Sequence, residues 1–407
     1  MLSTPALTSV QSRTSREFRA GSGQVLPTSG DMIASMWDRR TFGLSLMALP
    51  LASGPAFARK TGAAPPATRL NHIAVWVNDI DATARALEAN LGWTRAPFVM
   101  RTAADSGVGA LELALIDANG FWIELVCPAG PGPAKEVLDR RGAGAIGELN
   151  FRPHNFVSFT QDLRTKGIVP LGIDGKDLAN GGTLVLERND GSGWKPSPVQ
   201  IAYLPESVTH GTSVELYDGG NPNSDPFHRR TPSRERPGPG GQIARVDRLA
   251  IMVEDIERSA AFYTDILGLR RIPEIFALDG GSNESSGGMK VSFVDAGSAW
   301  LALVQPVGEG PLLDYVRKNG DGFIAELIVE VDDLAAYHDA VQARGIKLVD
   351  TRGQPVSDRD KAHVLEPFGD RIGYLPADAV GGMTIELSQR GPRATSLIHR
   401  RDIGWVR

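Results

Sequence analysis

Histidine and glutamate side chains in short strand-like segments are the residues of this chain best suited to chemistry. Four of them are His72 in residues 70–77, Glu124 in 121–126, Glu148 in 148–151 and Glu215 in 213–216. An imidazole nitrogen and carboxylate oxygens suit a borderline or hard divalent ion, and a glutamate can also accept a proton. The lone Cys127 excludes an intramolecular disulfide and a cysteine-cluster metal site, and we interpret it as a small buried hydrophobe. Whether the histidine and the three glutamates can act together depends on how the fold brings their segments into contact.

An internal repeat defines the elements that must position these residues. Residues 70–80 and 247–256 are both short alternating strands that end in an acidic turn and continue into a helix. The two helices end at matched pairs, Leu91-Gly92 and Leu267-Gly268. Each copy then closes with a predicted hairpin, at residues 114–126 and 291–304, with Asn-Gly or Ala-Gly-Ser at the turn.

A second pair of segments matches in the same way. The matched ranges are 148–151 with 326–329, 166–168 with 344–346, 201–205 with 372–376, and 213–216 with 384–387. Chance similarity at so many offsets is improbable. The sequence therefore predicts four related modules, the first paired with the second and the third with the fourth.

The composition is ordinary for a soluble globular protein. Of the 407 residues, 42% are apolar and 22% are charged, and the formal net charge is −5. That charge gives no reason to expect nucleic acid or an anionic membrane as partner. Residues 219–243 are rich in Pro and Gly and are interpreted as a flexible linker or as an arm over the surface. No fold is predicted for the basic tail, residues 392–407.

Residues 1–58 are interpreted as an N-terminal extension followed by a signal peptide. Arg39-Arg40-Thr41-Phe42 precedes an apolar run at 43–52 and the cleavage pattern Ala56-Phe57-Ala58. The paired arginines favour export to the periplasm by the twin-arginine route. The run is too short for a permanent membrane span. Met32 or Met36 is the expected start, and the alternative is a disordered N-terminus with a chance Arg-Arg pair.

Three strings carry a resemblance to a known family: "NHIAVWVNDIDAT", "IELVCP" and "IGYLPADAVGGMTIELSQ". They resemble the vicinal-oxygen-chelate superfamily (glyoxalase, bleomycin resistance and dioxygenase), and are most similar in character to methylmalonyl-CoA epimerase and glyoxalase I. The resemblance implies an α+β fold, with four βαβββ modules paired into two glyoxalase-like domains with cup-shaped mixed sheets. The implied domains are residues 69–218 and 244–391.

The family places metal ligands on the first and last strands of each module. In the first domain the resemblance implies His72, Glu124, Glu148 and Glu215, holding one divalent metal such as Zn, Mn, Ni, Co, Mg or Fe. Glu148 departs from the family, where a histidine usually stands. Two alternatives stay open: Arg152 could relieve a buried glutamate cluster, or a register shifted by two could place Asn150 in the site.

The corresponding positions of the second domain have different chemistry. They are Arg248, Ala302, Glu326 and Glu386. Alanine cannot ligate and arginine repels cations, so this second site is expected to be degenerate. Arg248 is predicted to bridge Glu326 and Glu386 by hydrogen bonds in place of a metal. The alternative is that the cluster binds an anionic group of a substrate.

The resemblance also implies a mechanism, in which the metal stabilises an enolate and a glutamate moves a proton. Glu215 is the implied base, and Asp105 is a second candidate, with a surface-loop role as its alternative. The expected function is a metal-dependent isomerase, epimerase or lyase acting on a small oxygenated carbonyl compound. A non-catalytic binding or resistance-type protein is the alternative. An extradiol-type dioxygenase is disfavoured because His72 is the only histidine at the eight ligand positions. A homodimer is the candidate assembly.

Overall fold

The computed structural model describes residues 68–102, 109–178, 180–219, 235–278, 288–350, 353–356, 364–365 and 370–389. The predicted signal segment (1–58), Asp105, most of the linker (219–243) and the tail (392–407) lie outside these described residues. Periplasmic export therefore stays a prediction. Within the described ranges, no helix is both long enough and apolar enough to span a bilayer.

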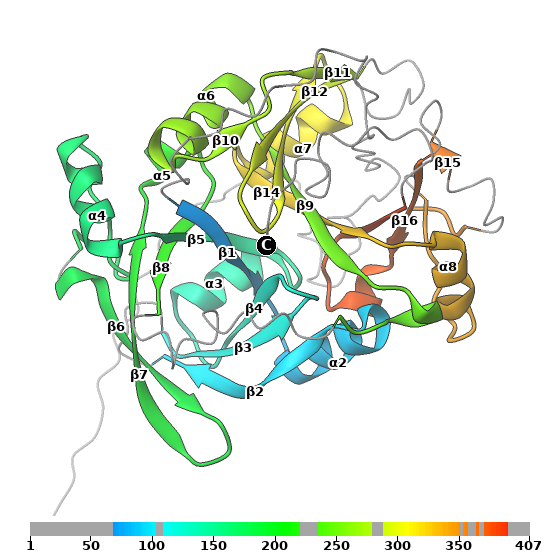
Figure 1. Ribbon diagram of the computed structural model, residues 1–407, viewed down its shortest axis with the longest axis horizontal. Helices are drawn as coiled ribbons and strands as arrows, with labels where there is room; N and C mark the ends of the chain where they lie inside the picture. The colour runs from blue at the N-terminus through cyan, green and yellow to red at the C-terminus, as the bar shows by residue number, and fades with distance from the viewer. Residues whose placement is uncertain are drawn as a thin grey trace, which may run out of the picture. The chain divides into compact units, whose positions relative to one another are not determined.

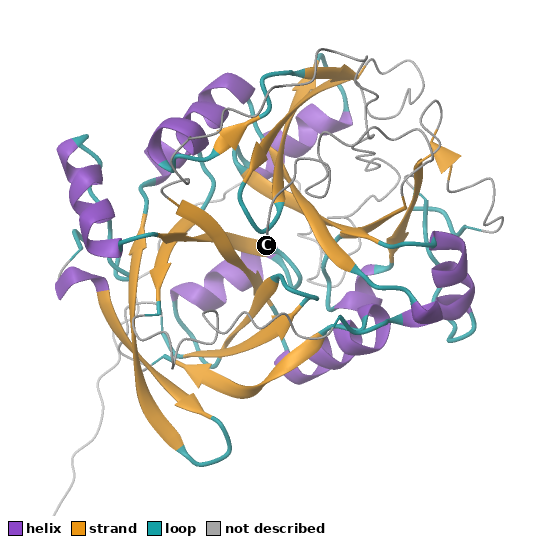
Figure 2. Cartoon of the chain, viewed as in Figure 1, coloured by secondary structure: helices purple, strands orange, loops and turns teal. Residues whose placement is uncertain are grey.

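Residues 68–218 form the first sheet, a closed barrel with strand order β1-β4-β3-β2-β6-β7-β8-β5 (Figure 1). Its strands are β1 (Thr68–Trp76), β2 (Thr94–Arg101), β3 (Leu111–Asp117), β4 (Trp122–Pro128), β5 (Ile146–Pro153), β6 (Thr183–Asn189), β7 (Trp194–Tyr203) and β8 (Val214–Asp218). Its helices are α2 (Ile80–Leu91), α3 (Pro133–Arg141), α4 (Phe156–Thr165), α5 (Glu206–Thr209) and the 3₁₀ turn η2 (Asn180–Gly182). Helix α3 contacts β4, and α4 contacts β5 and β8 (Figure 2).

The barrel corrects one expectation of shape. A cup-shaped mixed sheet was predicted, and the sheet is mixed, because β1–β4 and β5–β8 are parallel while its other ladders are antiparallel. The cup is closed, however, because β2 pairs with β6 through Val99–Asn189, Met100–Arg188 and Arg101–Glu187. Closure provides hydrogen-bond partners for the backbone N–H and C=O groups of β2 and β6, which would otherwise be edge strands.

Residues 245–389 form the second sheet, which has nine strands. Eight follow the order β10-β12-β13-β9-β14-β17-β16-β15, and β11 pairs with β12. The strands are β9 (Arg245–Met252), β10 (Arg270–Arg271), β11 (Phe276–Leu278), β12 (Gly288–Asp295), β13 (Trp300–Val307), β14 (Phe323–Glu330), β15 (Val364–Leu365), β16 (Asp370–Leu375) and β17 (Ile385–Gln389). The helical elements are η3 (Pro239–Gly241), α6 (Ile256–Ala261), η4 (Phe262–Ile266), α7 (Pro311–Asn319), α8 (Leu334–Gln342) and η6 (Ala377–Val380).

Helix starts and stops follow the sequence signals. The Asp79 carboxylate accepts a hydrogen bond from the Ala82 N–H at 2.8 Å, and Asp255 accepts one from the Arg258 N–H at 3.0 Å. Gly92 ends α2 in the left-handed region with φ 70°, which confirms the predicted Leu-Gly stop. The matching helix of the second half is less regular, because α6 passes into the π-helical turn η4 at Phe262.

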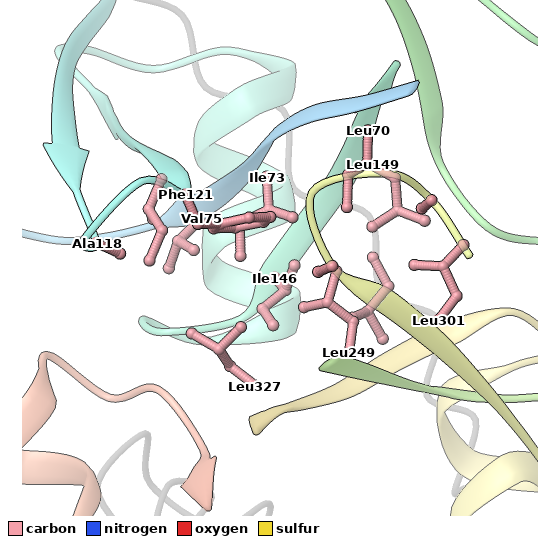
Figure 3. Close-up of a cluster of buried hydrophobic side chains, with 14 of the residues drawn as sticks. Leu70, Ile73, Val75, Ala118, Phe121, Ile146, Leu149, Leu249, Leu301 and Leu327 are labelled. Carbon is pink, nitrogen blue, oxygen red and sulfur yellow. The ribbon is translucent and has the colours of Figure 1, made fainter. Parts of the chain in front are cut away.

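One hydrophobic core joins the two sheets. Leu70, Ile73 and Leu149 of the barrel belong to the same buried cluster as Leu249 and Leu327 of the second sheet (Figure 3). Backbone and side-chain hydrogen bonds also cross between them, from the Leu70 N–H to the Ala296 oxygen at 2.8 Å and from the Ser298 hydroxyl to the Leu70 oxygen at 2.6 Å. The two halves therefore stabilise each other by burying a shared apolar surface.

The described end of the linker is packed against the barrel. The indole N–H of Trp93 donates to the Ala244 oxygen at 3.0 Å, and the Asn119 amide donates to the same oxygen at 2.9 Å. A Cβ on Gly92 would lie 2.7 Å from the Gly238 nitrogen, so the two chain segments are in backbone contact. The described segment is therefore in contact with the barrel at Gly238 and at Ala244.

Candidate functional site

A β-bulge lies immediately before each candidate residue of the opening strands. In the β1–β5 ladder, Leu70 pairs with Phe151 and His72 with Asn150, which leaves Asn71 as the extra residue. In the same ladder, Gly147 is the extra residue before Glu148. The β9–β14 ladder leaves Asp247 before Arg248 and Ala325 before Glu326. Bulges re-aim side chains, and here they do so at four equivalent positions.

The closing strands repeat a second relationship. Glu124 pairs with Ala74, which lies two residues beyond His72, and Glu215 pairs with Asn150, which lies two residues beyond Glu148. In the second half, Ala302 pairs with Ala250 and Glu386 with Ile328, each two residues beyond Arg248 or Glu326. The tertiary structure therefore puts the two predicted sets of four residues in equivalent places.

The first set lines one cavity inside the barrel. His72, Glu124, Glu148 and Glu215 all face a space of about 290 Å³, which Tyr203 of β7 also lines. Nε2 of His72 lies 3.9 Å from Oε2 of Glu124. The Tyr203 hydroxyl is hydrogen-bonded to the Glu215 carboxylate. Most of the other residues that line the cavity are apolar. The histidine, the three glutamates and Tyr203 are therefore a polar cluster in an otherwise hydrophobic cavity.

Burial dominates the electrostatics of this cluster. It raises the pKa of Glu124 to about 8, with a further contribution from the charge of Glu148. Burial raises the pKa of Glu148 to about 7, against the opposing charge of Arg141. The pKa of Glu215 is raised well above its usual value by burial and then by Glu148, and the Tyr203 hydrogen bond opposes that rise. Burial also lowers the pKa of His72 to about 3, so its imidazole is neutral.

The donor set suits a divalent cation. One neutral imidazole and three carboxylates are ligands for hard or borderline ions, and Oε2 of Glu148 is buried without a hydrogen-bond partner. Such a cation would also remove the cost of ionising three carboxylates in one cavity. As the side chains stand, no group of three or more His, Cys, Asp or Glu residues in the described part of the chain is drawn together into a coordination sphere.

The structure shows the position of Arg152 and of Asn150, the residues of the two alternatives for this site. Arg152 binds Asp218, with Nη2 at 2.9 Å from Oδ1, and the arginine whose charge acts on Glu148 is Arg141 of α3. Asn150 is buried beside His72 and Glu215, with its Nδ2 lacking a hydrogen-bond partner, but Glu148 is the residue that lines the cavity.

Sequence reasoning did not single out Tyr203 or Arg141. A signal existed for the tyrosine, because Tyr203 and Tyr374 stand at the same place in the matched segments 201–205 and 372–376. Arg141 had no such signal, since only the packing of α3 beside β4 brings it near Glu148.

The equivalent place in the second half holds a buried charge cluster. Nη1 of Arg248 lies 2.8 Å from Oδ2 of Asp247, and Nη2 lies 3.9 Å from Oε1 of Glu386. Oε1 of Glu326 has no hydrogen-bond partner, the contact of Arg248 with Glu386 has the length of an ion pair, and Asp247 accepts a hydrogen bond from the guanidinium. A hydrogen-bonded bridge from Arg248 to both glutamates therefore stays a prediction. Burial, followed by the charge of Glu386, raises the pKa of Glu326 well above its usual value, while Arg248 opposes the rise.

Comparisons with known proteins agree with this architecture. Residues 245–374 match the family model of the Glyoxalase/Bleomycin resistance protein/Dioxygenase superfamily. The resemblance to the vicinal-oxygen-chelate superfamily is therefore confirmed for this segment, which is about a third of the chain. The matched segment lies in the second half, where arginine and alanine occupy two of the ligand positions.

Sequence relatives of the chain are epimerases. The ethylmalonyl-CoA/methylmalonyl-CoA epimerase of Cereibacter sphaeroides is 28% identical over 148 residues, 36% of this chain and 98% of the relative. The mitochondrial methylmalonyl-CoA epimerase of Mus musculus is 26% identical over 152 residues, 37% of this chain and 76% of the relative. These relatives are enzymes, in agreement with the expectation that this chain is one too.

A solved structure resembles both halves at once. It is a mutant 4-hydroxymandelate synthase from Streptomyces coelicolor, with a TM-score of 0.54 and 16% identity, covering 80% of this chain and 93% of that one. At this identity the likeness concerns the fold alone.

Proposed function

We propose that the chain is a metal-dependent isomerase, epimerase or lyase whose active site is the cavity of the barrel. Its substrate is a small oxygenated carbonyl compound that reacts through an enolate. The observation that carries the proposal is the convergence of His72, Glu124, Glu148 and Glu215 on one apolar cavity, with the pKa values of all three glutamates raised. Perturbed titratable groups gathered in a cavity are a mark of catalytic sites.

These four residues would hold the divalent ion. When bound, such an ion polarises a carbonyl oxygen and stabilises the negative charge of an enolate. His72 is suited to ligation because its imidazole is neutral. Glu148 is suited because its buried Oε2 has no other partner.

The residues of the chain itself perform the proton transfer in this proposal. Glu215 accepts the proton from the carbon next to the carbonyl, and Tyr203 orients its carboxylate by a hydrogen bond. The apolar walls exclude water, which strengthens each electrostatic interaction with the reacting atoms. Asp105 stays a second proposed base, outside the described residues.

The second half supports the barrel in this proposal and has no chemistry of its own. We interpret the four strand–helix–strand groups as copies of one βαβββ module, as the repeated bulges before His72, Glu148, Arg248 and Glu326 favour. In this interpretation Arg248 occupies the place of a lost ion.

A non-catalytic binding protein is the second candidate function. It is favoured by the predominantly apolar lining of the cavity, which suits a hydrophobic ligand. The two candidates differ in metal content and in exchange of substrate hydrogen with solvent.

The proposal is tested by metal analysis of the purified chain, expressed with its N-terminal segment. The expected result is about one divalent ion per chain, lost in His72→Ala. His154→Ala is the matched control. This exposed histidine follows the end of β5 and does not line the cavity. Wild type should also catalyse deuterium exchange from solvent into a carbonyl substrate. A metal-free wild type of normal stability that shows no exchange would leave the binding protein as the function.

Export is proposed separately. Replacing both arginines by lysine, Arg39→Lys with Arg40→Lys, should retain the chain in the cytoplasm in a fractionation experiment. Unchanged periplasmic recovery would exclude the twin-arginine route.

A further inference from the structure

We infer that the barrel cavity selects a small, uncharged and largely hydrocarbon carbonyl compound. This inference rests on the proposed function, because it names the substrate class of the same site. It is carried by the chemistry of the cavity walls, the charge within the cavity and its size.

The cavity walls are predominantly hydrocarbon on several strands. Cavity-lining side chains include Trp76 of β1, Leu113 of β3, Val126 of β4, Leu186 of β6 and Ile201 of β7. Helix α3 contributes further apolar side chains to the same lining. A substrate that fills this space therefore gains binding free energy in proportion to the apolar surface that it removes from water.

The charge inside the cavity is of one sign. Glu124, Glu148 and Glu215 face it, and no lysine or arginine is among the described residues that line it. Three ionised carboxylates and a divalent ion would still leave a formal charge of about −1, and like charges repel strongly in such an apolar space. With the ion bound, an anionic substrate would therefore be repelled. Without the ion, an anionic group would be buried in an apolar space with no lysine or arginine among the described lining residues to pair with it, which is also unfavourable.

Arginines on the adjacent strands are engaged elsewhere. Arg101 binds Glu187 at 2.5 Å and stacks on the Trp194 ring at 4.0 Å. The Arg188 guanidinium lies over the Phe98 ring at 4.0 Å. Arg141, whose charge acts on Glu148, is therefore the cation that we choose, among the described residues, to test whether an anion is bound.

Size also limits the occupant. A cavity of about 290 Å³ is at the lower end of the roughly 300–1,000 Å³ found for ligand pockets. Some relatives are named for CoA thioesters, and the nucleotide and phosphate groups of a thioester would have to remain outside a space of this size. The inference therefore predicts a substrate that fits wholly within the cavity.

The test is calorimetric binding of three probes to the full chain. The neutral hydroxyketone 2-hydroxyacetophenone should bind at least about tenfold more tightly than phenylglyoxylate, an anion of similar size and shape. Methylmalonyl-CoA should bind no better than phenylglyoxylate. Equal or tighter binding of either anionic probe would overturn the inference, especially if Arg141→Gln abolished it. Failure of all three probes to bind would overturn it as well.

A matched pair of variants tests whether the apolar wall is responsible. Leu184→Gln changes a cavity-lining side chain of β6, and should weaken the neutral probe about tenfold. Val185→Gln changes the neighbouring residue, which is 52% exposed and does not line the cavity, and should leave affinity unchanged. Equal effects of the two variants would overturn the inference.

The two proposals fail in different ways. A chain that holds metal and catalyses exchange but prefers an anion contradicts only the substrate class. A chain with neither metal nor hydrogen exchange contradicts the catalytic function. If such a chain still binds the neutral probe, and Leu184→Gln weakens that binding, the inferred selectivity of the cavity is retained.

Discussion

The hydroxyl of Tyr374 in β16 donates a hydrogen bond of 2.7 Å to Oε2 of Glu386 in β17. Glu386 is fully buried, so this bond offsets part of the cost of enclosing a carboxylate. Tyr203 and Glu215 repeat the relationship on β7 and β8 of the barrel. The same pair thus serves stability in one half and is proposed to serve proton transfer in the other.

Tyr374→Phe should destabilise the protein by about 1–3 kcal/mol, because it leaves a buried acceptor of Glu386 without its donor. Chemical denaturation measures the change in the free energy of unfolding. Activity should be unaffected, since Tyr374 lies in the half without the cavity. A stability equal to wild type would contradict the structural role of this bond.

Tyr203→Phe should act on catalysis. The Tyr203 hydrogen bond lowers the pKa of Glu215, so removing it raises that pKa. A base must be ionised to accept a proton, and the acidic limb of the kcat/KM profile should therefore move to higher pH. Hydrogen exchange followed as a function of pH measures this shift, and an unmoved limb would exclude Glu215 as the base.

Arg248→Ala should destabilise the second half by about 3–5 kcal/mol, because Asp247 and Glu386 lose their buried cation. Arg317→Ala is the control, since that arginine is 57% exposed in its pair with Glu309 and should cost at most about 1 kcal/mol. Thermal unfolding distinguishes the two. Lost activity with an unchanged Tm in Arg248→Ala would instead favour binding of an anionic substrate group there.

Glu326→Gln should flatten the dependence of stability on pH. The pKa of Glu326 is raised in the folded state, so its contribution is fully present below the unfolded pKa and is lost as pH rises through the folded pKa. Between about pH 5 and pH 9, wild type should therefore lose more stability than the variant. Parallel curves for the two proteins would show that Glu326 does not titrate differently on folding.

Gly147→Ala should disturb the cavity through Trp76. A Cβ at position 147 would lie 2.3 Å from Nε1 of Trp76, which lines the cavity, so the indole must move. Overpacking of this kind costs about 1–3 kcal/mol and should weaken binding of 2-hydroxyacetophenone. At Gly130 an added Cβ meets nothing within 4 Å, so Gly130→Ala should match wild type in both measurements.

The sequence determined the local elements of this protein. Asp79 and Asp255 fix helix starts because short acidic side chains cap free backbone N–H groups, and Gly92 fixes a helix stop because glycine adopts positive φ without strain. The resemblance to the vicinal-oxygen-chelate superfamily named the candidate residues of both halves, and the sequence repeat gave their matched positions.

Only the tertiary structure decided how those residues meet. The bulges at Asn71 and Gly147 depend on pairing between β1 and β5, strands far apart in the sequence, so no local pattern reveals them. Barrel closure by β2 and β6, and the approach of Arg141 to Glu148, likewise arise from long-range packing. The raised pKa values of the cavity glutamates follow from the same cause, because burial is a property of the whole fold and not of any one segment.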